Sequence, residues 1–234
     1  MIKAEKIEKA VQQPDISADS PFEFDEKDLH PFLAYYARTF FQAYTKTIRH
    51  EKSKKKEFGE WVHPDMIGVY FPVKDWESEV LELSEATGNS ALKMYSFELK
   101  KTLSFGNLRE AFFQAVSNSS WANESYLVAA EISQDEDFLS ELRRLSTSFG
   151  IGVIELSLED PDSSKVVCPG RERESIDWDT LNKLTMNPDV RELLTRIKKD
   201  LQTKEFNEQK YDEVHHVKAL AKLLFPKGKP PAPS

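Results

Sequence analysis

Cysteine is almost absent from the sequence. Cys168 is the only one among 234 residues, so the chain cannot form an internal disulfide. A lone cysteine is typical of proteins in the reducing cytoplasm. The first residues lack the apolar core of a secretory signal peptide, and no hydrophobic run approaches the roughly 20 residues that span a bilayer. We therefore predict a cytoplasmic protein with no membrane partner.

Basic residues are outnumbered as well. Forty Asp and Glu stand against 32 Lys and Arg, which leaves a net charge of −8. This balance excludes an evenly basic coat, so a nucleic acid would have to meet a local basic patch. Hydrophobic residues make up only 39% of the chain, but 15 Phe and four Trp exclude a disordered composition. The length suits one medium domain with extensions.

The chain divides into four predicted segments. Residues 1–20 are charged and polar, and we expect a flexible leader there. Residues 21–203 contain the periodic apolar stretches and form the predicted domain. A C-terminal helix is expected within 204–225, and the proline-rich residues 226–234 are expected to be a disordered tail.

Apolar periodicity predicts an alternation of strands and helices. Strands are expected at 44–50, 61–71, 92–101, 124–130, 151–156 and, at a sheet edge, 166–168; helices are expected after Asp28, from Asn107, over 135–149, from Pro188 and over about 208–225. The strand–helix–strand order across 124–156 implies a parallel crossover. The predicted fold class is therefore α/β, with extra helices at the C-terminus.

Two of the apolar strands carry charged residues. Asp65 follows Pro64 where one strand opens, and Glu98 and Lys100 lie near the end of another. Because side chains alternate along a strand, Glu98 and Lys100 share a face and Leu99 points to the other. If the Asp65 strand is the neighbour, two carboxylates and one ammonium group meet there.

This set of groups suits metal-assisted hydrolysis of a phosphodiester. Carboxylate oxygens of Asp65 and Glu98 are the ligands that Mg²⁺ prefers, and bound Mg²⁺ polarises a phosphoryl group and acidifies water. Lys100 beside it can orient that water or stabilise the developing charge. The alternative is that these charges are ordinary ones, because Pro-Asp pairs recur at Asp15, Asp162 and Asp189. At Asp65 alone, however, the pair opens an apolar strand.

Polar residues near this site are candidate DNA contacts. At about 100° per residue, Asn107, Gln114 and Asn118 share one edge of a helix, which faces either the scissile phosphate or solvent. The basic loop Lys54, Lys55 and Lys56 contacts phosphates or is a solvated hairpin tip. Lys101 is a further candidate.

Two residues near these strands have simpler explanations. Glu26 is expected to favour a helix dipole rather than to reach a metal. His63, next to Pro64, is expected to be a structural imidazole rather than a ligand.

The layout of helix, three strands, helix and strand resembles the restriction-endonuclease-like superfamily, whose signature is written PD-(D/E)xK. The resemblance covers about residues 25–157. Within it, the block Phe113–Asn123 followed by Tyr126-Leu127-Val128 is similar to HrgA-like proteins, which are associated with bacterial restriction loci. The signature is loose, and the eleven-residue block is far more specific.

The resemblance implies a mixed β-sheet flanked by helices, so that 21–203 would be a nuclease-like domain. It implies cleavage of double-stranded DNA that depends on Mg²⁺, with Mn²⁺ as a substitute, in restriction or phage defence. By position, Asp65 and Glu98 match metal ligands and the Leu99 carbonyl a backbone ligand. Lys100 matches the catalytic lysine, and Gln114 the polar residue on the following helix.

The sequence departs from the family in one respect. Fuller relatives carry a winged-helix module before the first helix, and about twenty residues cannot hold one. The alternative function is therefore a catalytically silent nuclease fold that binds DNA or a partner protein. RNA cleavage at the same site is a third option, and a homodimer is plausible because double-strand cutting needs two sites.

Overall fold

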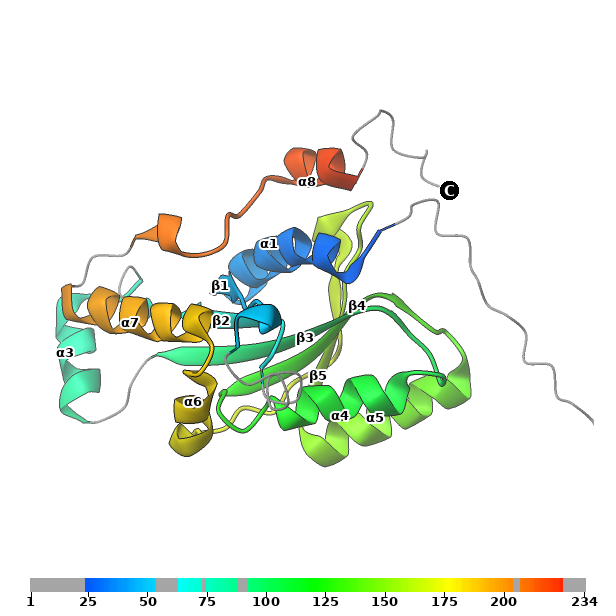
Figure 1. The fold of residues 1–234 in the computed structure, drawn as a ribbon, viewed down its shortest axis with the longest axis horizontal. Coiled ribbons are helices and arrows are strands. Elements are labelled where there is room, and N and C mark those ends of the chain that lie inside the picture. The colour runs from blue at the N-terminus through cyan, green and yellow to red at the C-terminus, as the bar shows by residue number, and fades with distance from the viewer. Residues whose placement is uncertain (1–23, 54–62, 73–74, 88–91, 204–206, 225–234) are drawn as a thin grey trace, which may run out of the picture.

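The computed structural model describes residues 24–53, 63–72, 75–87, 92–203 and 207–224 (Figure 1). Its centre is a six-stranded sheet in the order β1-β2-β3-β4-β5-β6. The strands are β1 (Tyr44–Thr47), β2 (Met66–Tyr70), β3 (Lys93–Leu103), β4 (Glu124–Ile132), β5 (Gly152–Glu155) and β6 (Lys165–Cys168). β3, β4 and β5 are parallel, and the other neighbours are antiparallel. The predicted α/β class with a mixed sheet is confirmed.

Helices cover both faces of this sheet (Figure 1). In the described residues the α-helices are α1 (His30–Phe40), α3 (Ser78–Ala86), α4 (Leu108–Ser117), α5 (Glu136–Phe149), α6 (Trp178–Leu184), α7 (Pro188–Thr203) and α8 (Val217–Leu224). Short 3-10 turns are η1 (Glu26–Leu29), η2 (His50–Lys52), η4 (Pro161–Ser163) and η5 (Glu208–Lys210). The predicted order of helix, three strands, helix and strand is found, and so is the parallel crossover through α5.

One face of the sheet packs against α1, and Leu220 of α8 belongs to the same buried cluster. Phe97 and Leu99 of β3 are fully buried there among residues of α1. Gly68 of β2 allows this packing, because a Cβ at that position would lie 2.7 Å from Cε2 of Phe97. The glycine thus leaves room for the Phe97 ring beside β2, whose first residue, Met66, pairs with Phe97 in the middle of β3.

The opposite face is covered by two helix pairs. α4 and α5 pack on β3–β5 around Leu127 and Val153, whereas α6 and α7 pack on β1 and β2 around Ile67 and Val69. Each helix brings an apolar stripe to the sheet, which is what stabilises it there. Glu98 lies on β3, the strand whose residues contribute to both of these clusters.

The structure differs from the predictions at several termini. The last helix covers only Val217–Leu224, so His215 and His216 precede it rather than lie on it. Asp28 closes the 3-10 turn η1 by accepting from the Asp25 N–H, and α1 begins two residues later. Helix α6 was not predicted.

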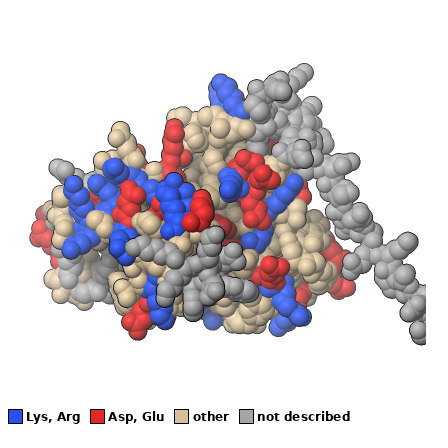
Figure 2. Space-filling model, viewed as in Figure 1, with Lys and Arg blue, Asp and Glu red and all other residues tan. Residues whose placement is uncertain are grey.

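Some predictions lie outside the described residues: the leader 1–20, the basic loop Lys54, Lys55 and Lys56, and the tail 226–234. In the part of the chain that the structure describes, no helix has the length and apolar character needed to cross a bilayer. Figure 2 shows Lys and Arg interspersed with Asp and Glu on the visible face, as expected for a surface without an evenly basic coat.

Candidate active site

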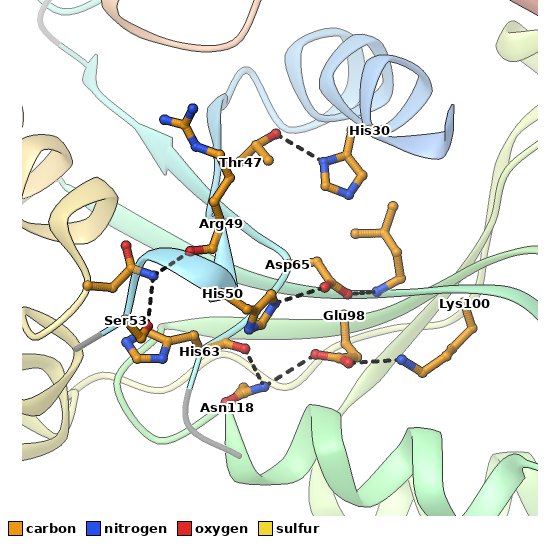
Figure 3. Close-up of polar contacts among 12 residues, drawn as sticks. His30, Thr47, Arg49, His50, Ser53, His63, Asp65, Glu98, Lys100 and Asn118 are labelled. Atoms are coloured by element: carbon orange, nitrogen blue, oxygen red, sulfur yellow. Dashed lines mark hydrogen bonds and ion pairs between the residues drawn. The ribbon is translucent and has the colours of Figure 1, made fainter. Parts of the chain in front are cut away.

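The site lies where β3 extends beyond the end of its neighbour β2. The pairing of β2 with β3 ends at Met66 and Phe97, and Asp65, the residue before β2, lies beside the next part of β3. The Asp65 N–H donates to the Phe97 carbonyl at 3.1 Å, and the Leu99 N–H donates to Asp65 Oδ2 at 2.7 Å. Continuing the register by one residue places Asp65 opposite Glu98, where Cβ atoms of a facing pair are about 5 Å apart. The two carboxylates therefore share one stretch of the sheet (Figure 3).

Glu98 is almost completely buried, with 6% of its surface exposed. Lys100 Nζ donates to Glu98 Oε1 at 3.0 Å, from the same face of β3. Asn118, which ends α4, donates from Nδ2 to Glu98 Oε2 at 3.2 Å and to the His63 carbonyl at 3.3 Å. The strand, the helix end and the segment before β2 therefore meet at this carboxylate.

The two carboxylates have opposite electrostatic surroundings. Burial and the nearby charge of Asp65 raise the pKa of Glu98 to about 7. Burial also disfavours the charged form of Asp65, but hydrogen bonds from His50 and the Leu99 N–H, with the charge of Lys100, hold its pKa below the ordinary value. For Lys100, burial is outweighed by the charges of Glu98 and Asp65, and its pKa is raised.

His50 joins the site although the sequence analysis did not select it. It lies on η2, directly after β1, and its Nε2 is 3.2 Å from Asp65 Oδ1. His30 of α1 is near enough for Asp65 to affect its pKa, which burial lowers. In the sequence His50 ends an expected strand beside a basic loop, and no motif there indicates a contact with Asp65.

The remaining predicted residues divide between the site and its surroundings. His63 is buried, and its Nε2 lies 3.2 Å from the Leu184 carbonyl, which fits the structural role expected for it. Glu26 is exposed on η1, close enough that its charge contributes to the raised pKa of Lys100. Gln114 places a buried Oε1 that has no hydrogen-bond partner among the described residues, and no described hydrogen bond links its side chain to Glu98 or Lys100.

Two candidate DNA contacts lie elsewhere. Asn107 closes the turn between β3 and α4, where Oδ1 accepts from the Ser104 N–H at 2.9 Å and Nδ2 donates to the Thr102 carbonyl at 2.7 Å. Lys101 projects to the opposite face of β3 from Lys100, with Nζ 4.7 Å from the centre of the Phe24 ring. The structure thus brings Asn118, but neither Asn107 nor Lys101, to Glu98.

The donor atoms at the site fit a hard divalent cation. Asp65 and Glu98 offer carboxylate oxygens, and each oxygen of Asp65 takes one described hydrogen bond, which leaves acceptor capacity for a cation. The Leu99 N–H and carbonyl point to the same edge of β3, so the carbonyl lies on the Asp65 side. Asn118 Oδ1 is a further buried oxygen that lacks a partner in the described residues.

No metal cluster of another kind is found among the residues that the structure describes. The described residues contain no group of three or more His, Cys, Asp or Glu side chains arranged to hold a metal ion. The expected set contains only two such side chains and completes its shell with a carbonyl. Compared with protein-family models, with curated proteins and with solved structures, the chain matches none of them, so the resemblance to nucleases rests on the residues alone.

Proposed function

We propose that this protein hydrolyses phosphodiester bonds of DNA in a reaction that depends on a divalent metal ion. The observation that carries the proposal is the convergence of Asp65, Glu98 and Lys100 at one stretch of the sheet. Lys100 Nζ lies 3.0 Å from Glu98, and burial together with the charge of Asp65 raises the pKa of Glu98. Perturbed carboxylates beside a lysine are typical of functional sites rather than of ordinary surface charges.

The side chains have distinct roles in this proposal. Asp65, Glu98 and the Leu99 carbonyl would hold Mg²⁺, with Mn²⁺ as a substitute. When bound, the ion would supply Lewis acidity toward the phosphoryl group and a more acidic water. Lys100 has 18% of its side chain exposed. Its ammonium can orient the attacking water and stabilise negative charge on the phosphoryl oxygens.

A plasmid assay tests the proposal. Purified protein should nick supercoiled DNA with Mg²⁺ or Mn²⁺, and chelator should stop nicking. Lys100→Ala should lower the rate by about 100-fold or more, because it removes a charge aimed at the reacting group. The matched control is Lys165→Ala, since Lys165 also lies on a strand and also contacts a glutamate, Glu155, at 3.0 Å. Nicking that survives Lys100→Ala would point to another site or to a contaminating nuclease.

The proposed substrate is double-stranded DNA, and the proposed setting is bacterial restriction or phage defence. Both follow from the similarity of Phe113–Asn123 to the HrgA-like block. Double-strand cutting would then need a homodimer. Sedimentation of the protein with a DNA duplex measures the stoichiometry, and a stable 1:1 complex that makes double-strand breaks contradicts the dimer.

One observation favours the alternative of a silent nuclease fold. Both oxygens of Glu98 already accept hydrogen bonds, from Lys100 and Asn118, and the residue is 6% exposed. A carboxylate held in this way can be a structural remnant of a site. DNA binding in gel shifts without turnover under any divalent ion would support it, as would wild-type function of Asp65→Ala.

A further inference from the structure

The turn between α6 and α7 is tied to the segment that leads from β1 into the site. Asp189, at the start of α7, is 2% exposed and accepts four hydrogen bonds from that segment. Three come from Arg49: from its backbone N–H at 3.1 Å, Nε at 2.9 Å and Nη2 at 2.8 Å. The fourth comes from Lys52 Nζ at 3.0 Å. One buried carboxylate thus holds both sides of the turn η2.

Asn187 completes this attachment from the same turn. It is fully buried, and its Nδ2 donates to the Arg49 carbonyl at 2.9 Å and to Ser53 Oγ at 3.1 Å. Its Oδ1 accepts from the Asp189 N–H at 2.9 Å, which fixes the two residues relative to each other. We call Asn187 and Asp189 the clamp. Its anchors lie on both sides of His50 in the sequence (Figure 3).

The clamp anchors the backbone on both sides of His50, and the Ile48 N–H, which donates to the Asp65 carbonyl at 2.9 Å, brings this segment alongside Asp65. His50 Nε2 is 3.2 Å from Asp65 Oδ1, and 34% of the side chain is exposed. The other oxygen of Asp65 accepts from the Leu99 N–H. A carboxylate held by one hydrogen bond can still rotate about its Cβ–Cγ bond, whereas bonds to both oxygens fix its plane. His50 is therefore the second of the two contacts that orient Asp65.

We propose that His50 is a positioning residue for Asp65 and that Asn187 and Asp189 hold it in place. The inference rests on the proposed function, since it assigns to Asp65 the binding of a divalent cation. It makes the start of α7 a support of the site, although α7 lies beyond residue 157, where the resemblance to nucleases ends. His50 orients the ligand through a hydrogen bond and is not itself assigned to the metal.

Metal binding is the first test, because it does not require turnover. Mn²⁺ titration followed by electron paramagnetic resonance gives the affinity of the wild type and of two variants. His50→Ala should weaken binding about 10-fold or more, the usual effect of losing a hydrogen bond to a ligand. His50→Gln should recover most of the affinity, because its amide N–H can reach the same oxygen. An alanine variant with unchanged affinity, or a glutamine variant no better than alanine, overturns the proposal.

A matched histidine serves as the control. His215 also lies beside a carboxylate, with Nδ1 3.6 Å from Glu213 Oε1, and it is partly exposed. His215→Ala should bind Mn²⁺ like the wild type. If His215→Ala weakens binding as much as His50→Ala does, the effect belongs to any lost histidine and the assignment of His50 fails.

The second test addresses the clamp. In Asp189→Asn the ¹⁵N resonances of the His50 ring should shift and Mn²⁺ affinity should fall. Asp200→Asn is the control, because Asp200 is a buried acid of the same helix that binds Arg196 and Tyr211 instead. It should leave the His50 resonances and the Mn²⁺ affinity unchanged. Equal effects of the two variants would mean that α7 acts only through stability, which overturns the clamp.

The two proposals can fail separately. Wild-type protein that binds Mn²⁺ and cuts DNA, with His50→Ala matching it in both, overturns only the role of His50. Wild-type protein that neither binds Mn²⁺ nor cuts overturns the nuclease and, with it, the role of His50 at a metal site. In that case, if the ¹⁵N resonances of the His50 ring do not shift in Asp65→Asn, the contact between His50 and Asp65 is refuted as well.

Discussion

Glu98 and Asp189 are both buried acids, but their surroundings shift their pKa values in opposite directions. Asp189 accepts hydrogen bonds from Arg49 and Lys52, which outweigh burial and hold its pKa far below the ordinary value. Glu98 faces a second carboxylate, Asp65, and burial raises its pKa to about 7. The charged form of Asp189 is therefore stabilised by the fold, whereas the charged form of Glu98 is disfavoured.

By this contrast, Asp189 stabilises the fold, whereas Glu98 does not. The four hydrogen bonds that Asp189 accepts leave its carboxylate no capacity for a ligand, and they contribute to stability. The carboxylates of Asp65 and Glu98 repel each other, and an added cation would relieve that repulsion. Residues kept in such surroundings are usually retained for function at some cost in stability. Substitutions of the two acids should therefore change the free energy of unfolding differently.

The largest expected effect is that of Asp189→Ala. Removing a buried charge that binds two cations and a backbone N–H should lower the free energy of unfolding by about 3 kcal/mol. Urea denaturation followed by circular dichroism measures it. Both cations are partly exposed and can turn toward water. A loss well below 1 kcal/mol would show that hydration of Arg49 and Lys52 fully replaces their contacts with the carboxylate. Asp189 would then not be a major source of stability.

The two acids should also give pH dependences of opposite sign. Asp189 has a lowered pKa in the folded protein, so its contribution is present above about pH 4 and is lost as the pH falls through the folded value. Glu98 has a pKa raised from 4.5 to about 7, so the folded protein holds a proton in that window that the unfolded chain has released. Stability therefore falls as the pH rises from 4.5 to 7.

Urea midpoints measured in chelator across pH 2–9 check these signs. Each group contributes a slope of up to about 1.4 kcal/mol per pH unit. Asp189→Asn should flatten only the acid side, and Glu98→Gln only the side between pH 4.5 and 7. If both variants changed the same limb, the two acids would not be opposed as the contacts indicate.

Local patterns in the sequence predict much of the surroundings of Glu98. Side-chain alternation places Glu98 and Lys100 on one face of β3, and the apolar run after Asp65 predicts the strand β2 but not its pairing with β3. These features depend on neighbours within about ten residues. The helical stripe of α4 places Asn118 on a polar edge but leaves open whether that edge faces the site or solvent. The structure brings Asn118 to Glu98.

The surroundings of Asp189 depend on distant partners that no local pattern specifies. Arg49 and Asp189 are 140 residues apart in the sequence, and Asn187 is 134 residues from Ser53. Periodicity indicates that a helix face is buried, but it does not identify the segment against which it packs. His50 was missed because no local pattern shows that its ring reaches Asp65. The Ile48 N–H brings the segment alongside Asp65 by donating to its carbonyl, and the distant clamp anchors the segment there.

A smaller effect is expected for Glu98→Gln. At pH 8 the amide removes a disfavoured charge but leaves Lys100 without its partner, so we expect unfolding free energy to stay equal or rise by about 1 kcal/mol. DNA cleavage should be lost in the same variant, because an amide is a poor ligand for Mg²⁺. A clear loss of stability would place Glu98 with Asp189, as an acid that stabilises the fold.

The smallest effect is expected at an exposed ion pair whose hydrogen bonds are shorter than those of either buried acid. Arg144 donates to Glu141 from Nε at 2.6 Å and from Nη2 at 2.7 Å on the surface of α5. Water screens this pair, and both side chains lose freedom when they bind, so Arg144→Ala should leave the thermal midpoint unchanged. Arginine and alanine are both good helix formers, so the helix itself is not weakened. If this variant cost as much stability as Asp189→Ala, short distance rather than burial would decide what an acid contributes.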